Sequence, residues 1–404
     1  MRTALRPRRL VPLLATSAAI AVLGTAGIVH VRADRSWQAM QAMADGLQQR
    51  LQARPHHRQP LWGEARPGSA FQHYELAMQK AHDLGATDKD ALLAMLPRTD
   101  ADTAEAPAAQ ALLARWQPVL EALHAGAHAA DATPPAAPTA PGQPGMTNLL
   151  DARWVVNLAM FEARALRHRG DGLAAVHRSL DAATFAVDLH RRGTLIDQMI
   201  ASAVVAIATT ECWTEPGLAR LDATALAALA GGLERLDAAL PETLDFDGEL
   251  SFSLRSVLSL PTEQGIPSMF SAWRYGFSTR WMLADAMLRT ARTNHELGAA
   301  TTLAWPQRRA LLDLELGALQ ACGNPIVAMT VPNLATAERG LRETTTLVRL
   351  LRMSVALHRG LDLPPLRDPL GDGPLRVTRQ ADGSVRLHGA GTEWRQNLVR
   401  TVTP

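Results

Sequence analysis

The sequence predicts a mainly α-helical protein: an N-terminal transmembrane helix, a body of solenoid-like antiparallel helical hairpins, and a small C-terminal β-hairpin module. The 404 residues are 47% hydrophobic but only 4% aromatic. Ala, Leu and Arg are abundant, whereas the β-branched and aromatic residues that favour strands are sparse. Apolar residues also recur at helical spacing in segments of about twenty residues. One uncharged segment near the N-terminus is long enough to cross a membrane.

The membrane segment extends from Leu10 to Val29 and contains no charged residue. A helix of this length rises about 30 Å, which matches the hydrocarbon core of a bilayer. Four arginines and no acidic residue precede the segment. The positive-inside rule therefore predicts a cytoplasmic tail at 1–9, a transmembrane anchor at 10–31 and an extracytoplasmic remainder. A cleaved signal peptide is the alternative, but the apolar run is longer than such peptides need, which favours a single-pass anchor.

The charge pattern argues against a nucleic-acid partner. The formal net charge is +2, and the arginines of residues 1–9 account for its positive sign. No cluster of basic and aromatic residues follows them, and such clusters are what neutralises phosphates. Lysine occurs only at Lys80 and Lys89, so chemistry that depends on a lysine has almost no candidates.

Composition divides the remainder of the chain into four parts. Five prolines, separated by Ala, Thr, Gly and Gln, form a segment that favours extended chain. Helical patterns lie on both sides of it, and four further prolines open the C-terminal module before its strands. The predicted parts are a helical region at 32–132, a Pro/Ala-rich linker at 133–146, a helical-hairpin body at 147–360 and a β-hairpin module at 361–404.

Helices are predicted wherever apolar residues keep a helical period and Gly, Pro or a polar turn ends the pattern. Their regular spacing in the body is typical of stacked helical hairpins. In the last of them, arginines line the side opposite the leucines, and we expect these arginines to form a solvated face. The predicted helices are 70–84, 108–124, 149–169, 172–192, 195–213, 218–240 and 335–358.

The C-terminal module contains two short alternating segments, 375–379 and 384–388, joined by Ala381-Asp382-Gly383. Alternation around an Asp-Gly turn predicts a β-hairpin. Two strands cannot bury enough surface to be stable alone. We therefore expect the hairpin to dock on the helices through Val377, Val385 and Leu387.

Cys212 and Cys322 are the only cysteines. In an oxidising compartment they can form one disulfide that closes a long loop, or remain two buried thiols in helices. The sequence does not distinguish these alternatives.

The best candidate for catalysis is a group of three carboxylates, Asp245, Asp247 and Glu249. Paired carboxylates can act as general acid and base. Gly248 stands at the fourth position of this segment, whereas a calcium-binding EF-hand loop needs Gly at the sixth. The alternative interpretation is structural, because acidic residues stabilise the first turn of a helix, here one that begins near Gly248.

His124 and His128 have the i, i+4 spacing that places two imidazoles on one helical face. No Glu lies between them in the manner of the H-E-x-x-H zinc motif, so we expect exposed histidines at a helix end. Nucleophile elbows, phosphate-binding loops and dinucleotide fingerprints do not occur in the sequence. The sequence therefore predicts no catalytic residue, no cofactor and no metal ligand.

The C-terminal segment DPLGDGPLRV, residues 368–377, with the turn at Gly383, resembles the hairpin of the major pseudopilins of type II secretion. Pseudopilins also have an N-terminal transmembrane helix. The prepilin-peptidase motif, with Phe and Glu opening the apolar run, does not occur here. The chain is therefore not expected to be a pilin subunit.

The whole layout is similar to a set of uncharacterised, membrane-anchored helical proteins of Gram-negative bacteria. Their A-x-x-x-Y-x-x-A signature is present as Ala70, Tyr74 and Ala77. The resemblance implies an architecture, with an anchor in the inner membrane and the bulk in the periplasm, and supplies no activity.

Together these features predict a noncatalytic scaffold or adaptor that binds an envelope protein, since helical repeats provide extended binding surfaces. The alternative is a periplasmic hydrolase whose acidic site is formed by Asp245, Asp247 and Glu249.

Overall fold

The computed structural model describes residues 31–95, 107–135, 151–211, 213–259, 276–324, 327, 333–389 and 398–403. The mainly helical class is confirmed, with a small antiparallel sheet near the C-terminus. Within these ranges no helix is both long and apolar enough to cross a membrane. The predicted anchor up to residue 30 and the predicted linker from residue 136 lie outside the described residues.

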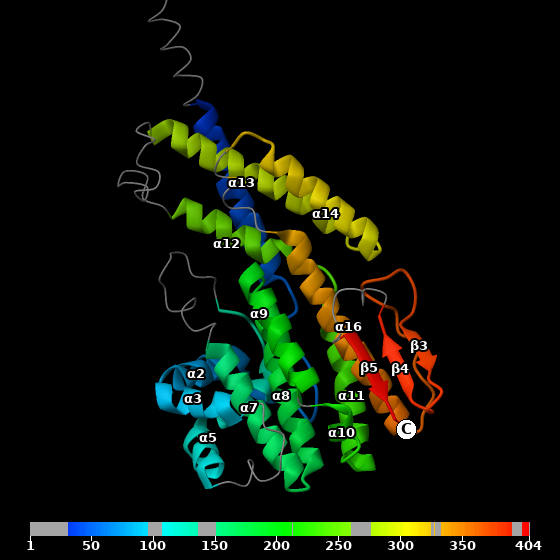
Figure 1. The fold of residues 1–404 in the computed structure, drawn as a ribbon. Coiled ribbons are helices and arrows are strands. Elements are labelled where there is room, and N and C mark those ends of the chain that lie inside the picture. The colour runs from blue at the N-terminus through cyan, green and yellow to red at the C-terminus, as the bar shows by residue number, and fades with distance from the viewer. Residues whose placement is uncertain are drawn as a thin grey trace, which may run out of the picture.

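The first described helix covers residues 31–52 and is called here the leading helix; it is the unlabelled dark blue helix in Figure 1. The other helices follow the labels of that figure. They are α2 (Ala70–His82), α3 (Ala86–Met95), α5 (Pro107–His128), α7 (Asp151–His168), α8 (Gly172–His190), α9 (Leu195–Ala206), α10 (Glu215–Leu218), α11 (Ala223–Ala239), α12 (Phe246–Leu258), α13 (Gly276–Ala299), α14 (Trp305–Gln320) and α16 (Leu334–His358).

Most predicted helices agree closely with observed ones, because their apolar periodicity is strong. The prediction for 195–213 was too simple, since α9 ends at Ala206 and a π-helical turn, Ile207–Glu211, follows it. The prediction for 218–240 was also inexact. The helix α10 ends at Leu218, and a new helix, α11, begins at Ala223. It begins there because the side chain of Asp222 accepts a hydrogen bond from the backbone N–H of Ala225 at 2.7 Å.

Helix α8 lies at the centre of the main core and contacts α5, α7, α9 and α11. Helices α2 and α5 pack closely beside it, because Gly126 allows the ring of Tyr74 to approach the α5 backbone. A Cβ atom at Gly126 would stand 2.4 Å from that ring. Tyr74 is fully buried, as are Ala70 and Ala77. The three residues of the signature are therefore part of the core.

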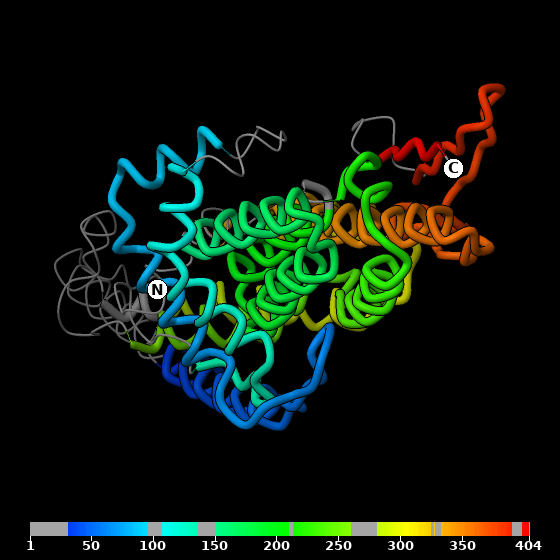
Figure 2. The backbone as a smooth tube through the Cα atoms, turned by 90° about the horizontal axis from the view of Figure 1, so that it is seen from below, coloured from blue at the N-terminus to red at the C-terminus, as the bar shows by residue number. Residues whose placement is uncertain are grey.

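A second group of helices packs at one end of the body (Figure 1). Met40 and Leu47 of the leading helix share a buried apolar cluster with Leu254 of α12 and Met287 of α13. The leading helix directly follows the predicted anchor in the sequence. The C-terminal sheet lies at the opposite end, far from the leading helix in both views (Figure 1, Figure 2).

The expected solvated arginine face of α16 is wrong. Arg342 is 1% exposed and pairs with Glu338. Arg349 and Arg352 both bind Asp237 of α11. Helix α16 contacts α9, α11, α14 and the sheet, so its arginines are covered by neighbouring elements and must be paired with carboxylates.

The C-terminal hairpin is confirmed as β3 (Arg376–Arg379) and β4 (Val385–His388), and a third strand that was not predicted, β5 (Val399–Val402), pairs with β4. Val385 and Leu387 are buried beside Leu350 and Met353 of α16. The packing expected for Val377 is wrong, because this residue is 43% exposed. Strand β3 is the outer edge of the sheet (order β3-β4-β5), and all of its residues are exposed.

Candidate functional site

The three carboxylates proposed as a hydrolytic site lie at the N-terminal end of α12, and arginines of the leading helix and the turn after it bind two of them, Asp245 and Asp247. Arg54 pairs with Asp245 and, at 3.3 Å, with Asp247. Arg50 also pairs with Asp247 at 3.3 Å. Asp245 caps the helix by accepting a hydrogen bond from the backbone N–H of Asp247. The structural interpretation of these residues is therefore confirmed for Asp245.

Glu249 points to a different neighbour, since its carboxylate accepts a hydrogen bond from the backbone N–H of Leu195 at 2.8 Å. Close contact between the backbones of Gly248 and Gly193 fixes the position of α12 beside the start of α9. A Cβ atom at Gly248 would stand 2.5 Å from the backbone of Gly193, and Gly193 has a φ of +82°. Glu249 thus holds α12 against the start of α9, whereas Asp245 and Asp247 hold it against Arg54 and Arg50, so the three carboxylates do not converge on one point.

His190 lies close enough to this segment for the charge of Asp245 to affect it. Burial lowers the pKa of His190 to about 4, although Asp245 partly opposes that change. A group with this pKa is neutral at pH 7 and is a weak general base there. The acidic segment therefore gains no effective proton acceptor from His190.

A groove of about 1000 Å³ lies between the leading helix, α12 and α13. Its floor is apolar, with Leu47, Phe246 and Leu250 buried. Its rim is polar and includes Arg292 and His295, which are both exposed. An apolar floor with a polar rim is typical of sites that bind peptides or small ligands.

A smaller pocket of about 220 Å³ lies on the other side of the leading helix, next to α12. Arginines line it, and no carboxylate does. Three of them are paired behind the pocket wall: Arg54 with the acidic segment, Arg191 with Asp188, and Arg192 with Asp197.

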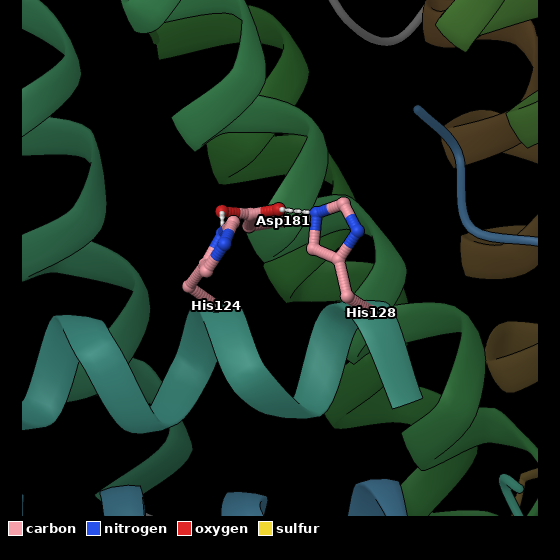
Figure 3. A group of neighbouring side chains, drawn as sticks. All are labelled: His124, His128 and Asp181. Carbon is pink, nitrogen blue, oxygen red and sulfur yellow. Dashed lines mark hydrogen bonds and ion pairs between the residues drawn. The ribbon is translucent and has the colours of Figure 1, made fainter. Parts of the chain in front are cut away.

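The third candidate is a cluster on α5 and α8 (Figure 3). His124 and His128 project from the last two turns of α5 toward Asp181 of α8. The Nδ1 atom of His124 lies 3.0 Å from Asp181 Oδ2, and the Nε2 atom of His128 lies 3.4 Å from Oδ1. The expectation of two exposed histidines is wrong for His128, which is 2% exposed.

Trp62 joins this cluster from the loop before α2. Its indole N–H donates a hydrogen bond of 2.7 Å to Asp181 Oδ1. The indole also stacks on His177 with ring centroids 3.7 Å apart and meets His128 edge-on at 4.4 Å. The rings of Trp62, His124, His128 and His177 and the carboxylate of Asp181 thus form one cluster beside α5 and α8.

Asp181 is ionised despite its burial. Burial opposes ionisation, but the adjacent imidazoles of His124 and His128 and the charge of Arg178 hold the pKa of Asp181 below its usual value. Arg178 is in turn paired with Glu162. The local arrangement therefore keeps one buried carboxylate in contact with two imidazoles.

Sequence analysis found the two histidines but missed Asp181, which lies 57 residues away from His124. One signal was available, since Asp181 interrupts an apolar stretch of α8 between Leu180 and Ala182. A buried acidic residue needs a partner. Among the cysteines, Cys322 is a free, half-buried thiol, and Cys212 lies outside the described residues.

Comparison with known proteins adds no identification: no family model, curated protein or solved structure matches the chain.

Proposed function

We propose that the protein is a noncatalytic scaffold or adaptor, anchored in a bacterial inner membrane by residues 10–31, whose periplasmic helical body binds an envelope protein. The single observation that best supports binding is the groove between the leading helix, α12 and α13. The hydrolase alternative receives no comparable support, because the carboxylates at 245, 247 and 249 are engaged by arginines and by backbone N–H groups.

The shape of the groove suits a helical segment of the partner. On α13 it is lined by one face of the helix, from Leu288 to Ala299. This face extends over about 16 Å, or three helical turns. Amphipathic helices bind in such grooves through apolar residues spaced three and four apart.

The charge of the rim selects an acidic partner. Arg50 is already paired with Asp247. Arg292 is exposed, and among the described residues it forms no ion pair. We therefore propose that the occupant is an amphipathic helix that places a carboxylate beside Arg292.

The membrane topology gives the first testable prediction. Alkaline phosphatase fused after Pro404 should be active and should fractionate with membranes, because the positive-inside rule places the body in the periplasm. An inactive fusion would refute the orientation. Activity only in the soluble periplasmic fraction would show that the segment at 10–31 is cleaved.

The groove gives the second prediction. A photo-crosslinking amino acid at His295, in the full-length protein in its membrane, should capture one protein through an acidic helical segment. Replacing Arg292 by Gln in the same background should reduce the adduct several-fold, because the ion pair with the partner is lost. Mass spectrometry of the crosslinked peptide identifies the segment.

Arg289 offers a matched control on the same helix, since it is exposed and already paired with Asp285 at 2.8 Å. Arg289→Gln should leave the adduct unchanged. A crosslink to another part of the same chain, or an adduct that responds equally to both substitutions, would refute the partner proposal.

A further inference from the structure

Three potential metal ligands converge where α5 crosses α8. The ligand atoms of His124, His128 and Asp181 all lie within 4.8 Å of one another. Figure 3 shows the two imidazoles on either side of the carboxylate, each facing one of its oxygens. His124 and Asp181 lie within helices, and His128 is the last residue of α5, directly before β2.

The contacts of His128 indicate that a cation fits between its ring and the Asp181 carboxylate. Its Nδ1 atom lies 3.2 Å from the backbone carbonyl of Glu64. A carbonyl oxygen only accepts hydrogen bonds, so Nδ1 is a donor, and in the tautomer with a single ring hydrogen Nε2 has a lone pair. That Nε2 atom is buried, makes no hydrogen bond and faces the Asp181 carboxylate. A lone pair directed at a carboxylate is satisfied by a cation between them.

The surroundings also suit a metal. Trp62 donates to Asp181 Oδ1 and Glu64 accepts from His128, and such contacts orient the ligands of metal sites. Arg178 touches Asp181 at 3.3 Å, but its charge is balanced by Glu162. One negative charge of Asp181 therefore remains to offset a divalent cation.

We propose that His124, His128 and Asp181 bind a divalent transition-metal ion such as Zn²⁺. Two imidazoles and one carboxylate are ligands that Zn²⁺ accepts, with bonds of about 2.0–2.2 Å. Tetrahedral geometry with such bonds separates neighbouring ligand atoms by about 3.3 Å; the His124 and His128 nitrogens lie 3.0 and 3.4 Å from the two Asp181 oxygens, one each, and one ligand atom of each residue lies within 4.8 Å of the others. The side chain of His124 is 31% exposed, so the cluster is accessible to solvent at this residue.

The test is Zn²⁺ binding to the full-length protein in detergent, measured by competition with a chromophoric chelator. The wild type should bind one ion tightly and melt at a higher temperature with Zn²⁺, because a ligand that prefers the folded state stabilises it. Loss of an orienting contact costs about 10–100-fold in metal affinity. Trp62→Phe should therefore weaken binding by that factor, and His124→Ala by at least about 100-fold.

His82 provides the matched control. It forms a histidine–aspartate pair with Asp151 at the same 3.0 Å distance, but without a second imidazole. His82→Ala should bind Zn²⁺ as the wild type does. Absence of binding to the wild type, or an affinity that His124→Ala does not change, would refute the site.

A second measurement needs no variant. Diethyl pyrocarbonate modifies accessible imidazoles, and mass spectrometry locates the modification. Zn²⁺ should protect His124 from the reagent and leave the modification of His82 unchanged. Equal modification of His124 with and without Zn²⁺ would show that the cluster is an ordinary hydrogen-bonded histidine–aspartate pair.

Discussion

Replacing Glu338 by Gln is expected to lower the free energy of unfolding by about 3–5 kcal/mol, because it removes the only carboxylate of a buried ionic triad. Glu338 lies between Arg308 of α14 and Arg342 of α16, at 2.9 and 3.0 Å, and all three side chains are at most 1% exposed. Gln keeps the shape but leaves two guanidinium groups without a counterion. Chemical denaturation of the full-length protein in detergent measures the change.

Two controls separate this effect from a general sensitivity of α14 and α16. Asp313→Asn removes an exposed i, i+4 pair with Arg309 on α14 and should cost no more than about 0.5 kcal/mol. Replacing the whole triad by apolar residues of similar size should recover much of the loss, since no buried charge then remains. A Glu338→Gln protein as stable as the wild type would contradict the assignment of the triad as buried.

Replacing Asp188 by Asn should have an effect of similar size, about 3–5 kcal/mol. The Asp188 carboxylate is fully buried and lies 2.8 Å from the guanidinium of Arg58, whose side chain is 4% exposed. Tyr74 also donates a hydrogen bond of 2.7 Å to it. The substitution leaves the buried charge of Arg58 uncompensated, and thermal or denaturant unfolding reports the loss.

Tyr74→Phe is the graded comparison, because it removes the two hydrogen bonds of the hydroxyl group, to Asp188 and from Arg58, and retains the ion pair. It should cost about 1–3 kcal/mol, at about 0.5–1.5 kcal/mol for each hydrogen bond. Equal losses for Tyr74→Phe and Asp188→Asn would show that the ion pair contributes nothing beyond these hydrogen bonds. This network explains in physical terms why Tyr occupies the centre of the signature formed with Ala70 and Ala77.

The features that sequence analysis predicted correctly are those encoded within short stretches of chain. The helix at 335–358 follows from its apolar period, and the hairpin follows from alternation around Asp382-Gly383. The strand Val399–Val402 was missed, although Val, Arg, Thr and Val also alternate, because residues 389–398 separate it from its partner β4 and no two-residue turn motif marks the pair.

The features that could not be predicted depend on contacts between distant segments. The periodicity of α16 shows Arg342 opposite the leucines, but not that Arg308 and the carbonyl of Pro369 lie there. The same limit applies to the cluster on α5 and α8. His124 and His128 form a visible pair, whereas Asp181 comes close to them only through the packing of the two helices.

Helix α16 supplies residues to three of the four buried apolar clusters. Val348 and Leu351 belong to the main core, Leu341 and Leu347 to the cluster with α14, and Met353 to the cluster beneath the sheet. Elements that share one rigid helix cannot melt independently without exposing a face of it. The elements of these three clusters should consequently unfold as one cooperative unit, in which the amides of α16 exchange with solvent only when that unit opens.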